Sequence, residues 1–229
     1  MLRASPLMEE ETYHIFNRGA NKQEIFHWPV DYDRFMLLLY ISNTSENIHL
    51  STLLRNKDQG RSLIEAYNRP IDKALVDVLA YALMPNHFHL ILKQKSAGGI
   101  TLFMKKLATA YAMYFNIAHE HSGVVFQGRF QSRLVDTDPY YRWLFSYVHL
   151  NPVDLVEPGW KERGITNIAR SRAFINDYRY SSYTDLRGVA RPESSILTFE
   201  AIPTFIKKSD DLEDMLKWER RGRVLYDQL

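Results

Sequence analysis

The feature that most constrains the fold is a pair of apolar runs separated by a tight turn. Residues 74–83 (ALVDVLAYAL) are followed by Met84-Pro85-Asn86, and a second apolar run then occupies 87–93. Proline and asparagine are typical turn residues, and apolar runs of this length between turn signals are typical of buried strands. The pattern therefore predicts a β-hairpin whose two strands lie side by side in one sheet.

The segments around this hairpin alternate between strand and helix patterns. A strand is expected at 12–18, a helix at 31–42, a long helix at 98–118, a further strand within 124–136 and a helix from 138 to 151 that stops before Pro152. This is the βαββαβ order of a ferredoxin-like α+β sandwich with an antiparallel sheet, extended by a C-terminal helix. The sequence thus predicts one compact sheet with helices packed on it.

Three segments define the expected domain organisation. Residues 1–188 are expected to form a single domain, and the polar stretch 43–71 is expected to be an insertion or loop within it. Residues 189–229 differ in composition and are expected to be a C-terminal helical extension, with a charged helical pattern at 209–224.

Composition narrows the chemistry only by exclusion. The chain has 229 residues, a formal net charge of +2 and no cysteine, so disulfides, thiolate metal sites and cysteine nucleophiles are excluded. No apolar run approaches the roughly 18 residues of a membrane helix, and the N-terminus lacks the apolar core of a signal peptide. A cytoplasmic location is therefore expected.

The second strand of the hairpin begins with two histidines two residues apart. In a strand, His87 and His89 project from the same face while Phe88 points to the opposite one. Two neutral imidazoles side by side can bind a divalent cation. An isolated His-x-His is common, however, and is also compatible with two polar residues on an exposed strand face.

The helix at 138–151 carries a tyrosine and an asparagine on one face. Tyr147 and Asn151 are four residues apart, which places their Cβ atoms about 5–6 Å from each other, whereas His149 points elsewhere. An amide oxygen suits a hard cation such as Mg²⁺, so Asn151 can complete a site begun by the imidazoles. The alternative is that Tyr147 is a core aromatic residue and Asn151 merely ends the helix.

In combination, these motifs resemble the single-tyrosine HUH transposases, and in particular the REP-associated tyrosine transposases. The resemblance spans about residues 12–188 and is carried, in order, by Tyr13-His14-Ile15-Phe16-Asn17-Arg18-Gly19, Met84-Pro85-Asn86-His87-Phe88-His89, Phe126-Gln127-Gly128-Arg129-Phe130, Tyr147-Val148-His149-Leu150-Asn151-Pro152-Val153 and Tyr180-Ser181-Ser182-Tyr183.

The resemblance implies a function and a set of roles. His87 and His89 match the ligands of Mg²⁺ or Mn²⁺, Asn151 matches the third ligand and Tyr147 matches the nucleophile. The implied reaction is metal-dependent cleavage and rejoining of single-stranded DNA beside imperfect hairpins, through a 5′-phosphotyrosine and without ATP. The implied partner is hairpin-containing repeat DNA; a monomer and a homodimer both remain open.

Four basic residues are candidates for contacts with DNA phosphates. Lys105 and Lys106 are expected on the polar side of the long helix, and Arg129 and Arg133 on one face of the strand within 124–136. Each of them, taken alone, is better explained as a solvated surface charge.

Two other functions compete with an active transposase. One is a non-catalytic, hairpin-binding regulatory module on the same fold, which would need neither the histidine pair nor Tyr147. The other is a rolling-circle replication initiator, which would share the histidine pair but not the surrounding motifs.

Overall fold

The centre of the molecule is a four-stranded antiparallel sheet with strand order β2-β3-β1-β4. The computed structural model describes residues 6–46, 65–207 and 212–226. Its strands are β1 (Thr12–Arg18), β2 (Val76–Met84), β3 (His87–Gln94) and β4 (Gln131–Leu134). The predicted hairpin is confirmed as β2 and β3, which pair from Met84 opposite His87 outward.

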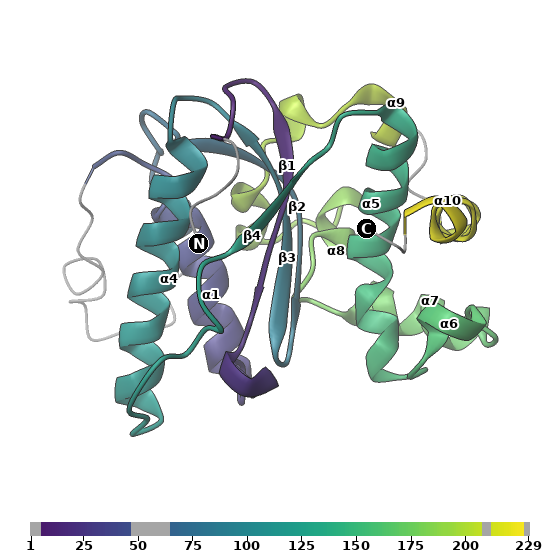
Figure 1. Cartoon of the computed structure of the whole chain (residues 1–229), viewed down its shortest axis with the longest axis horizontal. Coiled ribbons are helices and arrows are strands. Elements are labelled where there is room, and N and C mark those ends of the chain that lie inside the picture. The colour runs from purple at the N-terminus through teal and green to yellow at the C-terminus, as the bar shows by residue number, and fades with distance from the viewer. Residues whose placement is uncertain (1–5, 47–64, 208–211, 227–229) are drawn as a thin grey trace.

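Helices cover both faces of this sheet. Helices α1 (Pro29–Ile41) and α4 (Gly99–Ala118) lie on one face, and α5 (Asp138–Leu150) lies on the other (Figure 1). The chain passes through β1, α1, β2, β3, α4, β4 and α5 in that order. The predicted α+β class, antiparallel sheet and order of elements are therefore confirmed.

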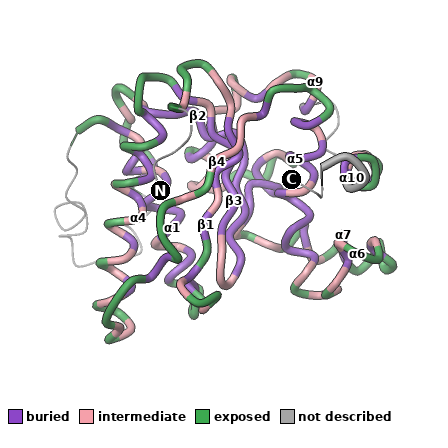
Figure 2. Tube along the Cα trace, in the orientation of Figure 1, coloured by how far each residue is buried: buried purple, intermediate pink, exposed green. Residues whose placement is uncertain are grey.

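Each face of the sheet has its own apolar core. Ile15, Phe35, Leu90 and Phe103 belong to the core between the sheet and α1 and α4, whereas Ile91, Leu144 and Val148 belong to the core between the sheet and α5. Neighbouring residues of β3 enter different cores because side chains alternate along a strand. Strands β2 and β3 are accordingly buried along most of their length (Figure 2).

Local side-chain hydrogen bonds explain where helices α1 and α5 begin. Asp31 at the start of α1 accepts hydrogen bonds from the backbone N–H groups of His27 (2.8 Å) and Trp28 (2.9 Å). Thr137 precedes α5, and its side chain accepts a bond from the Tyr140 N–H. Such caps satisfy helix N–H groups that have no partner within the helix.

The strand predicted within 124–136 is shorter than expected. Only Gln131–Leu134 forms β4, and it pairs with the first half of β1. Before it, Gly128 has a φ of +146°, and the Gln127 N–H donates to the Arg18 carbonyl at 2.9 Å. The chain therefore bends at 127–130, between its contact with the end of β1 and the start of β4.

The C-terminal part continues the layer that begins with α5. It contains helices α6 (Trp160–Arg163), α7 (Ile168–Asp177), α8 (Tyr183–Leu186), α9 (Thr204–Lys207) and α10 (Leu212–Tyr226), with 3-10 helix η2 (Asn151–Leu155) directly after α5. Leu212, Met215 and Leu216 of α10 share an apolar cluster with Leu150 and Trp160.

The contact between α10 and α5 is close. A Cβ atom at Gly222 would lie 1.9 Å from Cδ1 of Trp143 on α5, so a residue without a side chain is needed there. The charged segment predicted as helical is therefore packed against the helix that carries Tyr147, although residues 208–211 lie outside the described part of the chain.

Two further expectations concern the stretch 43–71 and membrane-spanning helices. Most of the stretch 43–71, expected to be an insertion or loop, lies at 47–64, outside the described residues. Within the part of the chain that the structure describes, no helix has both the length and the apolar character needed to cross a membrane.

Candidate active site

The two histidines of the predicted motif lie on the α5 side of the sheet. His87 and His89 project from β3 toward α5, and their ring centroids are 5.0 Å apart. Phe88 between them enters the opposite core. The strand geometry expected from the His-x-His spacing is therefore present.

Helix α5 brings Tyr147 to this histidine pair. The Tyr147 ring centroid lies 5.4 Å from that of His89, and Trp143 stacks on the other side at 5.3 Å. Tyr147 is half-buried, whereas Tyr140 on the same helix is buried in the apolar core. Of these two aromatic residues, Tyr147 is the one placed beside the histidines.

Asn151 lies one helical turn after Tyr147, at the end of α5. Its amide N–H donates to the Tyr147 carbonyl at 3.3 Å, and a hydrogen bond joins its side chain to His87. Its Oδ1 accepts from the ammonium of Lys161 at 3.1 Å. The structure thus gathers His87, His89, Tyr147 and Asn151 in one place.

The imidazoles of this site are held in their neutral form. Burial, followed by the positive charge of Lys161, lowers the pKa of His87 to about 4, although a hydrogen bond to the Asn151 side chain acts in the opposite direction. Burial also lowers the pKa of His89 well below its usual value, aided by His14 and His87. Neutral imidazoles keep a lone pair, which is what a cation requires.

Hydrogen bonds to Nδ1 leave the other ring nitrogen of each histidine available. His87 Nδ1 lies 2.7 Å from Asn86 Oδ1, which can only accept, so the proton of His87 is on Nδ1. His89 Nδ1 lies 2.9 Å from Nε2 of His14. In the tautomer in which His89 donates to His14, the Nε2 atoms of His87 and His89 each carry a lone pair rather than a proton.

His14 is a site residue that the sequence analysis did not assign. It lies on β1, and its ring is stacked on that of His89 at 5.1 Å and lies 6.5 Å from that of Tyr147. Burial lowers its pKa to about 3. Its place inside the Tyr13-His14 motif was the only sequence signal, because no local pattern predicts which strand will pair with β3.

Lys161 is the second unassigned residue. Besides its bond to Asn151, its ammonium lies 5.2 Å from the centroid of the Tyr147 ring. It comes from the short helix α6, which no sequence motif marked.

His149 belongs to the core, as its helical position predicted. It is buried, with Nδ1 2.9 Å from the Phe145 carbonyl and Nε2 2.8 Å from Ser182 Oγ. Both ring nitrogens therefore have partners within the fold, and His149 is not part of the histidine pair.

The four basic residues proposed for DNA do not form one group. Arg133 on β4 pairs across the sheet with His14 and covers the Tyr140 ring at 4.7 Å, so it lies beside the site. Arg129 is exposed but precedes β4, which corrects the expectation that both arginines lie on one strand face.

The two lysines lie on the other side of the sheet, on α4. Lys105 is exposed there, and the ammonium of Lys106 donates to the carbonyls of Thr44 (2.5 Å) and Glu46 (2.6 Å). Lys106 therefore ties α4 to the chain after α1, and a role of either lysine in DNA binding stays a prediction.

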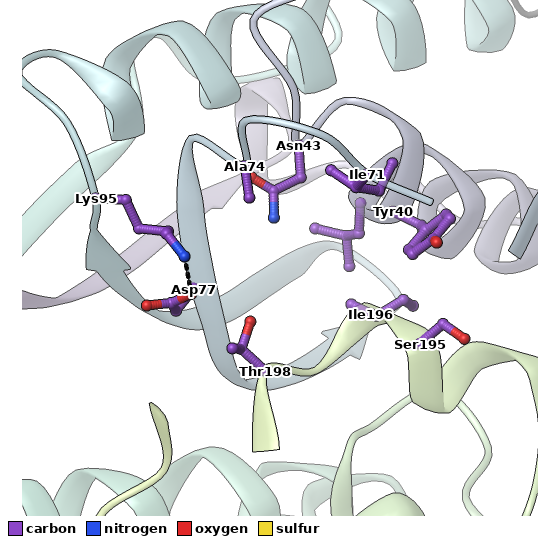
Figure 3. Close-up of a pocket in the computed structure, with 10 residues that line it drawn as sticks. Tyr40, Asn43, Ile71, Ala74, Asp77, Lys95, Ser195, Ile196 and Thr198 are labelled. Atoms are coloured by element: carbon purple, nitrogen blue, oxygen red, sulfur yellow. Dashed lines mark ion pairs between the residues drawn. The ribbon is translucent and has the colours of Figure 1, made fainter. Parts of the chain in front are cut away.

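A cavity of about 220 Å³ lies at the opposite end of the hairpin, where Lys95 pairs with Asp77 at 3.2 Å (Figure 3). Tyr40, Asn43 and Ile196 also line it. His87 is next to the hairpin turn, whereas Asp77 and Lys95 are at the open end. The cavity is thus separate from the histidine site.

Comparison with known families assigns the segment that carries the site. Residues 51–151 match the family model described as "Transposase IS200 like". This segment is therefore similar to the IS200-like transposases. The IS200-like segment includes β2, β3, α4, β4 and α5, and with them His87, His89, Tyr147 and Asn151. It begins inside 43–71 and leaves out β1 and Lys161, and the expected domain limits stay a prediction.

No curated protein matches the chain. Among solved structures, one described as a REP-associated tyrosine transposase bound to a REP hairpin is similar, with 15% identity and a TM-score of 0.44 over 84% of this chain and 89% of that one.

Proposed function

We propose that the chain is a metal-dependent single-stranded DNA endonuclease and transposase that uses Tyr147 as its nucleophile. The observation that carries this proposal is the meeting of Tyr147 with His87, His89 and Asn151 inside an IS200-like segment. A hairpin-binding protein without catalysis would need no such grouping. The hairpin substrate itself follows from the motif resemblance.

The donor set fits a divalent cation such as Mg²⁺ or Mn²⁺. Nε2 of His87 and of His89 and Oδ1 of Asn151 would hold it, with water or phosphate oxygens completing the coordination. The motif resemblance and the position of Asn151 beside Tyr147 and His87 support its amide oxygen as the third ligand. When bound, the cation polarises the scissile phosphate and neutralises its charge.

The protein's own residues then carry the strand transfer. Tyr147 Oη attacks the phosphorus and loses its proton to solvent. A P–O bond to Tyr147 forms as the P–O3′ bond breaks, and the leaving oxygen takes up a proton to become a free 3′-OH. The phosphodiester energy is kept in the phosphotyrosine, so attack by another 3′-OH rejoins the strand without ATP.

We further infer that the sheet with α1 and α4 is a ferredoxin-like sandwich. The strand order β2-β3-β1-β4 supports this, because each of its two βαβ halves returns to the same sheet past a central strand. Helix α5 is then an addition on the free face of the sheet, where it presents Tyr147.

The test is formation of a covalent DNA adduct. Labelled single-stranded hairpins from the flanks of the gene are incubated with the protein and Mn²⁺, and a band shifted on a denaturing protein gel is expected. Tyr147→Phe should reduce the adduct by at least ~10³-fold while hairpin binding stays within about twofold, because only the nucleophilic oxygen is removed.

Tyr140→Phe is the matched control, since it removes the same atom from the same helix seven residues earlier, at a buried position. It should leave the adduct intact. Tight hairpin binding with no adduct in the unmodified protein would instead favour the non-catalytic regulatory module.

A further inference from the structure

Lys161 occupies the point where the proposed nucleophile and the proposed amide ligand meet. Its ammonium donates to Asn151 Oδ1 at 3.1 Å and lies 5.2 Å from the centroid of the Tyr147 ring. Its charge also reaches His87 and His89, lowering the pKa of both. A single cationic side chain thus contacts or influences Tyr147, Asn151 and both histidines of the pair.

The segment around Lys161 is firmly anchored. Trp160 is fully buried in the same apolar cluster as Leu150 and Val153, which lie one residue before and two residues after Asn151 in the chain. On the other side, the Gly159 N–H donates to Asp154 Oδ1 at 3.2 Å, and Gly159 itself has a φ of +77°. The backbone of α6 therefore holds Lys161 at the site.

Two cations cannot share the Asn151 oxygen at close range. A divalent ion bound to Oδ1 of Asn151 and to the imidazoles would face the Lys161 ammonium at contact distance, where like charges repel strongly in a partly buried site. The ammonium must then move. The nearest new anion in such a site is the scissile phosphate of the bound strand.

We propose that Lys161 is a phosphate-binding catalytic residue, whose ammonium leaves Asn151 Oδ1 when a divalent cation binds there and then contacts the scissile phosphate. This inference rests on the proposed function. During attack by Tyr147 the phosphate gains negative charge, and a positioned ammonium stabilises that charge. Lys161 forms and breaks no covalent bond.

The inference predicts opposite effects on two measurements. Lys161→Met removes the competing charge, so Mn²⁺ binding measured by calorimetry without DNA should tighten by about 3–10-fold. The same variant should slow single-turnover adduct formation at saturating Mn²⁺ by about 10²-fold, because a charged contact to the phosphate is lost. A purely structural lysine would give weaker binding and slower cleavage together.

Two variants complete the design. Lys161→Arg keeps the charge and should retain adduct formation within about tenfold of the unmodified protein. Lys217→Met removes an exposed lysine that pairs with Asp214 on α10 and should change neither measurement. Thermal melting of each variant identifies any loss of folding.

The outcomes separate this inference from the proposed function. Unchanged or weaker Mn²⁺ binding in Lys161→Met overturns the inference, and so does unchanged adduct formation. If the unmodified protein forms no adduct, the proposed function fails, and the calorimetric comparison alone still decides whether Lys161 competes with the cation. Tighter Mn²⁺ binding together with slower cleavage supports both.

Discussion

Two groups of histidines on opposite sides of the sheet have different hydrogen-bond partners. On the α5 side, His14, His87 and His89 bond to one another or to an amide, beside Tyr147. On the other side, His119 pairs at 2.9 Å with Asp31, near the ring of His27. The same side chain thus belongs to the proposed cation site in one region and is a hydrogen-bond partner of a buried carboxylate in the other.

The difference lies in the partners. Asp31 is fully buried and accepts four hydrogen bonds, from the backbone N–H groups of His27 and Trp28, the Tyr114 hydroxyl and the His119 ring. Burial raises its pKa, but these bonds outweigh burial and lower it. The carboxylate of Asp31 therefore has all its hydrogen-bond partners within the fold, whereas the histidine pair beside α5 keeps ring lone pairs that a cation can use. Changes at Asp31 and its partners should affect stability, and changes at the histidine pair should affect chemistry.

Among the changes that distinguish these two histidine groups, His87→Ala should produce the largest effect. Loss of one of three protein ligands should reduce metal-dependent adduct formation by about 10²-fold or more at limiting Mn²⁺, with little loss of thermal stability. Adduct formation is measured over a Mn²⁺ titration, with His121→Ala as a histidine control outside the site. Unchanged activity at limiting Mn²⁺ would contradict the metal assignment.

Asp31→Asn should show the reverse pattern. An amide offers one acceptor oxygen and places an N–H₂ group among donors, so the free energy of unfolding should fall by about 2–3 kcal/mol. Adduct formation below the melting temperature should remain. Denaturant unfolding measures the first quantity; a large loss of cleavage in a folded variant would mean that the two regions are coupled.

Acid should destabilise the protein through its buried histidines. The folded pKa is about 3 for His14 and about 4 for His87 and His149, below the ordinary value of 6.5. The unfolded chain therefore binds more protons between these limits, so the stability present above about pH 6.5 is lost as pH falls toward 4. The Tm should drop by about 5–10 °C between pH 7 and pH 4.5. A flat Tm over this range would argue that these histidines are already charged in the fold.

The smallest expected effect distinguishes Arg133 from Lys106. Arg133→Gln should weaken hairpin binding and reduce the slope of log affinity against log salt by about 1, because one phosphate contact beside the site is lost. Lys106→Gln should leave the slope unchanged, since its ammonium is held by the carbonyls of Thr44 and Glu46. Binding is measured between 50 and 200 mM salt; equal slopes for both variants would remove Arg133 from the interface.

Much of the site was encoded in local spacing. The two-residue repeat of a strand places His87 and His89 on one face, and the helical repeat places Asn151 beside Tyr147. The turn at Met84-Pro85-Asn86 fixed the hairpin, and the apolar stripe of 98–118 fixed the long helix. In each case the contacts are between residues close in sequence, so the pattern alone was sufficient.

The tertiary structure decided what lies between those motifs. Pairing of β1 with β3 brings His14 to His89, 75 positions away, and the packing of Trp160 brings Lys161 to Asn151. The packing of α4 on the other face of the sheet placed Lys105 and Lys106 on the far side from Arg133. By itself the sequence determined the chemistry of each motif, because strand and helix periods are local; which motifs meet was decided by strand pairing and core packing, which join residues far apart in the chain.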